Sequence, residues 1–200
     1  MGKCLFNFKL KSIFVLLLFI SSTNFSYVYG NSIIPKSLEK LHNSLIDIGL
    51  NKIDKNEKDI MNIIIKETYA VKKMSKIILG KYWLKASDIE KNEFSKKFVE
   101  FISSNYLKRF ANTNKLEIKY GKTEEISKKY IMVFTQFNFT KNDSLKINYL
   151  LTRDEKNWKI FDVLLDGSIS EIATKKSEFN KILEKGGINS LIKMLSDQSK

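Results

Sequence analysis

The apolar residues of this chain change their spacing near Asn112, and this change constrains the fold more than any other feature. Before it, between Phe94 and Phe110, aromatic side chains recur with a helical period. After it, residues 116–120 alternate between apolar and charged, which is typical of a half-buried strand. The sequence therefore predicts a block of helices followed by a set of antiparallel strands.

The helical block is divided by recognisable start and stop signals. Pro35 suits the first turn of a helix that we expect to continue to Ile48. A second helical region is expected from Lys55 to a C-cap at Gly80, with a bend near Thr68. Ser87 and Glu90 have the spacing of a capping box, so the aromatic helix should begin there. The stripe of phenylalanines on this helix is interpreted either as ordinary core or as one wall of a cavity.

The strand block is expected to be a meander of about four strands. We expect strands over 116–120, 130–140, 145–151 and 158–165, with a polar turn or ragged hairpin over 121–129. A β-bulge near Asp162 would change which face of the last strand points inward. After Gly167 the chain should become helical again, with Ser168 as the cap and a break at Gly186–Gly187. The expected fold class is α+β, with helices on one side of a curved antiparallel sheet.

Residues 1–30 have the pattern of a signal peptide. Lysines precede a short apolar run from Ile13 to Ile20, which is too short to span a bilayer, and small residues precede a cleavage boundary after Gly30. An uncleaved anchor is the alternative. Cys4 lies in this segment, so a mature chain of residues 31–200 would form one domain without cysteine, and with no thiolate nucleophile or Cys-containing metal site.

The chain is strongly basic, with a formal net charge of +13. The segment before Gly30 holds only lysines among its charged residues, so the remainder is basic as well. Nucleic-acid binding is disfavoured because the chain is predicted to be exported and arginine occurs only at Arg109 and Arg153. The charge is interpreted either as a solvated surface or as attraction to anionic lipid headgroups.

Catalytic residues are sparse in this sequence. His42 is the only histidine and is interpreted as a surface or interface residue, and no HExxH, GxSxG or phosphate-loop motif is present. Asp162 or Asp166 could act as a general base if burial raised the pKa of the carboxyl. The alternative is that such an aspartate accepts backbone amides where the last strand leaves the sheet.

Several blocks, in this order and spacing, resemble the MlaC family, also called the toluene-tolerance auxiliary proteins. The blocks are Leu79-Gly80-Lys81-Tyr82-Trp83, Ala86-Ser87, Glu93-Phe94, Tyr149-Leu150-Leu151, Trp158 to Val163, Gly167-Ser168, and the closing Phe179 to Leu183 with Gly187 and Leu191-Ile192. No block is decisive alone, but the ordered set spans nearly the whole mature chain.

The resemblance implies an NTF2-like fold with a hydrophobic cavity between sheet and helices. It implies a periplasmic phospholipid carrier with no cofactor or metal and no enzymatic activity. Its partners would be an outer-membrane lipoprotein–porin complex and an inner-membrane ABC transporter with an MCE-domain subunit, and its role would be to maintain outer-membrane lipid asymmetry. The alternatives are an NTF2-like enzyme acting on a hydrophobic substrate and a basic periplasmic adaptor without ligand.

A carrier needs apolar pocket walls rather than reactive groups. Burying an acyl chain is favourable by about 0.8 kcal/mol per methylene, so headgroup contacts can be few. The side chains expected to surround the acyl chains are aromatic or aliphatic: Tyr82, Trp83, Phe94, Phe98, Tyr106, Phe134, Tyr149, Leu151, Trp158 and Val163.

Overall fold

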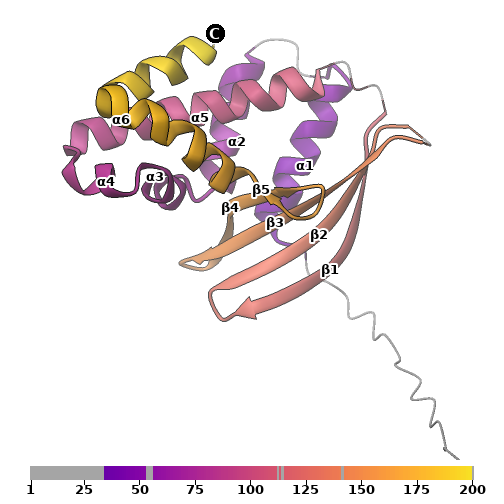
Figure 1. The fold of residues 1–200 in the computed structure, drawn as a ribbon. Helices are drawn as coiled ribbons and strands as arrows, with labels where there is room; N and C mark the ends of the chain where they lie inside the picture. The colour runs from indigo at the N-terminus through magenta and orange to yellow at the C-terminus, as the bar shows by residue number, and fades with distance from the viewer. Residues whose placement is uncertain (1–33, 53–55, 112, 114, 141, 200) are drawn as a thin grey trace, which may run out of the picture. The chain divides into compact units, whose positions relative to one another are not determined.

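A computed structural model describes residues 34–52, 56–111, 113, 115–140 and 142–199. The predicted signal peptide lies outside these residues. Along the described chain, helices α1 to α5 precede the strands and helix α6 follows them (Figure 1). Their bounds are α1 Lys36–Gly49, α2 Glu57–Thr68, α3 Val71–Leu79, α4 Lys81–Lys85, α5 Asp88–Phe110, β1 Glu117–Ser127, β2 Tyr130–Asn138, β3 Ser144–Asp154, β4 Asn157–Leu165, β5 Ile169–Ser170 and α6 Glu171–Gln198.

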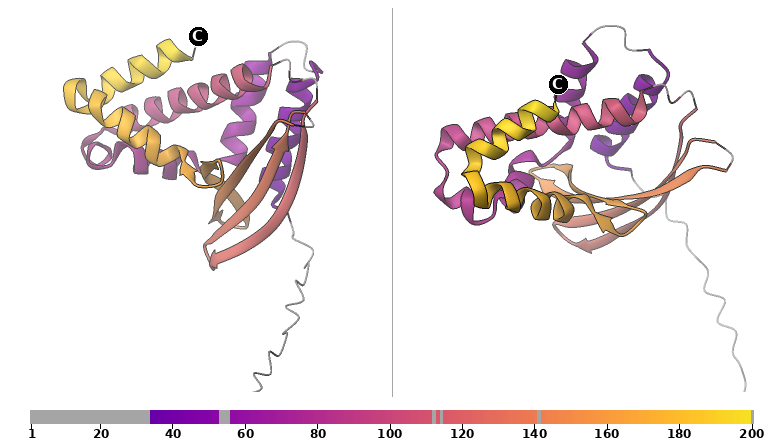
Figure 2. Two further views of the ribbon diagram at one scale, coloured as in Figure 1. Left: turned by 45° about the vertical axis from the view of Figure 1, so that its right-hand side comes forward. Right: turned by 45° about the horizontal axis from the view of Figure 1, so that its top comes forward.

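The sheet is an antiparallel meander in the order β1-β2-β3-β4-β5. It is strongly curved, and the helices lie on one side of it (Figure 2). Alternate residues of β2, from Ile131 to Phe137, are buried on the helix-facing side, while Tyr130, Met132 and Phe134 on the other face are half-buried. The α+β fold class and the curved sheet covered by helices on one side are confirmed.

The first strand is longer than predicted, because Gly121 does not end it. Strand β1 continues through Gly121 with a register shift between Tyr120 and Thr123. A Cβ atom at position 121 would lie 3.3 Å from the Cβ and carbonyl oxygen of Phe134, so glycine allows close approach of the paired strand. Of the two alternatives expected over 121–129, the turn is wrong: the segment is part of a hairpin with two register shifts, and the β1–β2 turn lies after Ser127.

The predicted breaks within the helices occur close to their expected positions. The bend near Thr68 is a complete interruption between α2 and α3, where the Ala70 amide donates to the Ile160 carbonyl of β4 at 2.8 Å. Gly80 caps α3 with a φ of 50°, and Gly187 interrupts α6 with a φ of 67°. In the left-handed region of φ a side chain is strained, which explains glycine at both positions.

The start of α6 differs from the prediction. Ser170, not Ser168, caps this helix, and its hydroxyl accepts the Ala173 amide at 3.0 Å. Ser168 lies in the preceding turn, because the two-residue strand β5 pairs with β4 before the helix begins. No helix among the described residues is both long and apolar enough to cross a membrane.

Candidate functional site: an apolar cavity between sheet and helices

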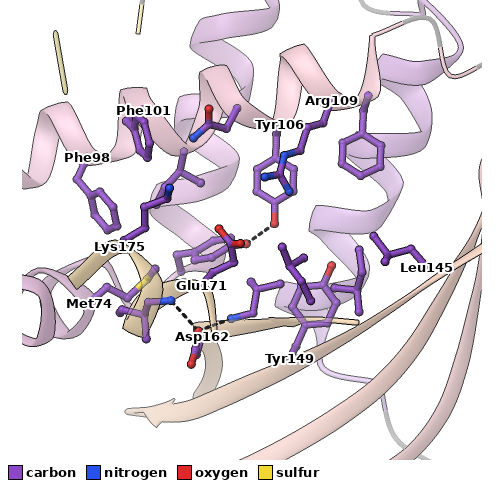
Figure 3. A pocket seen from close by; sticks show the side chains of 18 of the residues that line it. Met74, Phe98, Phe101, Tyr106, Arg109, Leu145, Tyr149, Asp162, Glu171 and Lys175 are labelled. Carbon is purple, nitrogen blue, oxygen red and sulfur yellow. Dashed lines mark hydrogen bonds between the residues drawn. The ribbon is translucent and has the colours of Figure 1, made fainter. Parts of the chain in front are cut away.

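A cavity of about 490 Å³ lies between α5, α6 and the concave side of the sheet (Figure 3). This volume is within the usual range of small-molecule pockets. Its lining residues are Tyr69, Met74, Phe98, Phe101, Ile102, Asn105, Tyr106, Arg109, Phe110, Phe139, Leu145, Ile147, Tyr149, Asp162, Val163, Leu165, Glu171, Ile172, Lys175 and Gln198.

Helix α5 supplies one wall of the cavity, and its start is fixed by the predicted capping box. The Glu90 amide donates to the Ser87 hydroxyl at 3.2 Å, and the Ser87 amide donates to the Glu90 carboxylate at 2.8 Å. The backbone and side-chain hydrogen bonds from Ser87 also lower the pKa of Glu90, which keeps this cap charged. The box therefore fixes the residue at which α5 begins.

Aromatic contacts keep α5 in position against its neighbours. Phe94 stacks on Phe98 with ring centroids 5.7 Å apart, and Phe110 packs on Phe137 of β2 at 6.0 Å. At α6, Phe101 meets the edge of Phe179 at 6.0 Å. The Phe110–Phe137 contact therefore positions the C-terminal end of α5 against the sheet, and the Phe101–Phe179 contact positions its middle against α6.

Three of the residues that line the cavity are buried or half-buried tyrosines, and their hydroxyls are neutral. Tyr69 and Tyr106 share a hydrogen bond at 2.5 Å between their hydroxyl oxygens. Burial raises the pKa of Tyr106 to about 12, and burial is also the main reason that the pKa values of Tyr69 and Tyr149 lie well above 10. These phenols carry no charge at physiological pH, so they do not oppose an apolar ligand.

Behind Tyr149 the polar network continues to His42. The two ring nitrogens of His42 lie 2.7 Å from the Tyr120 hydroxyl and 3.1 Å from the Tyr149 hydroxyl. Burial lowers the pKa of His42 to about 3, so the ring is neutral and provides one donor and one acceptor nitrogen. His42 is 1% exposed, and its interpretation as a surface or interface residue is wrong. It holds the Tyr149 ring in place.

Charged and amide side chains form the solvent-facing rim of the cavity. Arg109 and Gln198 are exposed, and Asn105, Glu171 and Lys175 are half-buried, whereas most apolar lining residues are buried. Figure 3 shows Arg109, Glu171 and Lys175 near the aromatic side chains of α5. The cavity thus combines an apolar interior with a polar opening that carries both signs of charge.

The two aspartates considered as general bases have different surroundings. The Asp162 carboxylate is buried and accepts the Val163 amide at 2.8 Å, the Ile172 amide at 3.1 Å and the Ser170 hydroxyl at 2.6 Å. These bonds connect β4 to the start of α6. They match the alternative interpretation, in which the aspartate accepts backbone amides where the strand leaves the sheet. Asp166 is exposed in the following turn and does not line the cavity.

The predicted pocket residues fall into two groups. Phe98, Tyr106, Tyr149 and Val163 line the cavity. The remaining predicted residues lie elsewhere: Tyr82 and Trp83 in α4, Phe94 and Leu151 in the solid core, Phe134 on the outer face of the sheet, and Trp158 near the β3–β4 turn. Which side chains touch a ligand stays a prediction.

Several lining residues were not predicted, although helical or strand periodicity places them on the same face as residues that were. Counting from Phe98, the cavity side of α5 includes positions 101, 102, 105, 106, 109 and 110, which form one continuous helical face. On the strands, Ile147 lies two residues from the predicted Tyr149, and Leu165 lies two residues from the predicted Val163, so each pair shares a face of its strand. The polar members, Asn105 and Arg109, are recognisable only from their place on that face.

Comparison with known proteins agrees with this geometry. The fold is an α+β domain with an apolar cavity between its sheet and helices, and the MlaC protein family matches residues 40–197. The chain belongs to the MlaC family. No curated protein sequence matches it.

A similar solved structure is that of the phospholipid-binding protein from Ralstonia solanacearum in complex with a phospholipid. The two chains are 15% identical, the match covers 82% of this chain and 96% of that chain, and the TM-score is 0.68. At this level of identity the likeness shows a shared fold.

Among the described residues no group of three or more His, Cys, Asp and Glu side chains is placed to hold a metal ion. The described cavity offers apolar surface, neutral hydroxyls, the buried and hydrogen-bonded Asp162 carboxylate, and a polar rim. This arrangement is suited to holding an amphipathic molecule.

Proposed function

We propose that this chain is a periplasmic phospholipid carrier that holds acyl chains in the cavity between α5, α6 and the sheet. The observation that carries the proposal is the apolar cavity of about 490 Å³ with its polar rim. Membership of the MlaC family and the phospholipid named for the similar Ralstonia protein support it.

The binding energy would come from removing acyl methylenes from water. Each buried methylene contributes about 0.8 kcal/mol, so on the order of ten methylenes would contribute roughly 8 kcal/mol before the cost of ordering the lipid is subtracted. Phe98, Tyr106, Tyr149 and Val163 would contact the chains, and the rim would face the glycerol and headgroup. No residue needs to react, so the proposed role is binding and transfer rather than catalysis.

The proposed partners follow from the family. The carrier would receive or deliver lipid at an outer-membrane lipoprotein–porin complex and at an inner-membrane ABC transporter with an MCE-domain subunit. This exchange would maintain outer-membrane lipid asymmetry. Residues 1–30 would direct export and be removed near Gly30, which leaves the carrier in the periplasm.

The proposal is tested by lipid extraction from the protein purified without detergent after export, followed by mass spectrometry. We expect co-purified phospholipid, and we expect the protein to move labelled phospholipid from donor to acceptor vesicles. A protein that is recovered empty and that moves no lipid would contradict the proposal.

A further inference from the structure

A second depression, also of about 490 Å³, lies where the α2–α3 junction meets the β3–β4 hairpin. We call it the basic depression. Its lining residues are Lys66, Tyr69, Ala70, Val71, Lys72, Lys73, Lys76, Thr152, Arg153, Asp154 and Lys159. It is concave, and it combines cations from two helices and one hairpin that lie far apart in the sequence.

The charges of this depression are strongly unbalanced. Asp154 is the single carboxylate of the lining, and it pairs with Lys159 at 3.1 Å. Lys66, Lys72 and Lys76 are exposed and form no ion pair with any residue of the described chain. Like charges gathered in one hollow repel one another, so an anionic ligand would be attracted there.

The framework beneath these lysines is held by specific contacts. The hydrogen bond from Ala70 to Ile160 fixes the α2–α3 junction to β4. Lys73 donates to the Tyr130 hydroxyl at 2.9 Å and to the Thr152 hydroxyl at 3.1 Å, which joins α3 to the sheet. The depression is therefore a formed feature of the fold and not a chance grouping of surface chains.

The basic depression is separated from the apolar cavity. Tyr69 lines both, is 2% exposed, and directs its hydroxyl to Tyr106 on the cavity side. A lipid in the cavity would have to displace this buried ring to place its headgroup among the lysines. An anionic ligand of the depression would therefore be a different molecule from a lipid in the cavity.

We propose that the basic depression binds an acidic, aspartate- or glutamate-rich segment of a partner protein. Its concave form suits an inserted peptide segment, whereas the flat face of a bilayer would not reach all of its cations together. Its cations are mostly lysines, which act as point charges and accept carboxylates in many orientations. Tyr69, the aromatic residue of this lining, is buried and offers no surface for stacking nucleic-acid bases.

The test measures binding of a fluorescently labelled poly-glutamate peptide to the purified protein by anisotropy. A variant with Lys66, Lys72, Lys76 and Arg153 each changed to Gln should bind about tenfold more weakly or worse, and wild-type binding should fall with added salt. A matched variant with Lys176, Lys181, Lys185 and Lys193 changed to Gln removes the same charge from exposed positions of α6, and it should bind like wild type.

A second variant should bind the peptide more tightly than wild type, a result that misfolding would not produce. Asp154→Asn removes the competing carboxylate and releases Lys159, so peptide binding should become about two- to fivefold tighter. Equal losses in the two lysine variants, or no gain in Asp154→Asn, would overturn the proposal. So would a depression variant that loses binding to phosphatidylglycerol vesicles but not to the peptide, because that result assigns the site to membranes. Lipid content measured on the same samples reports on the cavity separately, so the two proposals can fail independently.

Discussion

Filling the apolar cavity from the strand side should weaken lipid binding without unfolding the protein. Val163 lies on β4, lines the cavity and is half-buried, so Val163→Trp would direct an indole ring into the empty space. Tryptophan fits a strand position, and the added bulk enters a void rather than a filled core. We therefore expect the free energy of unfolding in urea to change by less than about 1.5 kcal/mol.

The expected loss of affinity follows from the excluded acyl surface. Tryptophan has about seven more non-hydrogen atoms than valine, and if about four methylenes are displaced the loss is roughly 3 kcal/mol, or about a hundredfold in Kd. The assay is titration with a fluorescent phospholipid, together with the lipid-bound fraction in native mass spectrometry.

The matched control is Met132→Trp, which adds an indole on the outer face of β2, away from the cavity. It should keep wild-type affinity. A Val163→Trp protein that binds lipid as tightly as wild type would refute the assignment of this cavity to acyl chains.

Two further predictions concern the buried polar groups. Asp162→Asn should keep its lipid, because the carboxylate serves the β4–α6 connection, while the free energy of unfolding falls by about 1–2 kcal/mol; loss of lipid transfer with unchanged stability would contradict this role. The pKa of His42 is lowered by burial from 6.5 to about 3, so the unfolded chain binds the proton more tightly and stability is lost as pH falls below about 6.5. Urea unfolding should show about 2 kcal/mol less stability from this group at about pH 5 than at about pH 7. This loss of stability should be absent in His42→Gln. An equal loss in that variant would contradict the assignment of the effect to His42.

The sequence predicted helix starts, helix ends and a β-bulge well where a single residue type has a specific local role. The capping box at Ser87 starts α5, Gly80 and Gly187 end or interrupt helices, and the register shift of β4 falls between the partners of Leu150 and Leu151, beside Asp162. Each signal acts within a few residues and needs no knowledge of the rest of the fold.

Features that depend on distant residues were not predictable in the same way. Glycine at position 121 indicates a turn when the sequence is considered alone. In the structure it lies within a strand, where a side chain would crowd Phe134 of the paired strand. His42 shares a helix face with Leu38 and Leu45, and only the position of Tyr120 and Tyr149 shows that its burial is compensated.

The cavity is the clearest example of this limit. Periodicity shows that Leu151 and Tyr149 share a face of β3, but not that one enters the solid core and the other borders a void. That difference depends on where α5 separates from the curved sheet. Contacts between rings far apart in the sequence, such as Phe110 with Phe137, position α5 against the sheet, and no single segment encodes them.

The most direct test of the account is an experimental structure of the protein purified without detergent after export. We predict continuous elongated density between α5 and strands β3 and β4, beside Tyr149 and Val163 and ending near Arg109. An interior in which side chains close this space, or a lipid bound at a different place, would contradict the account.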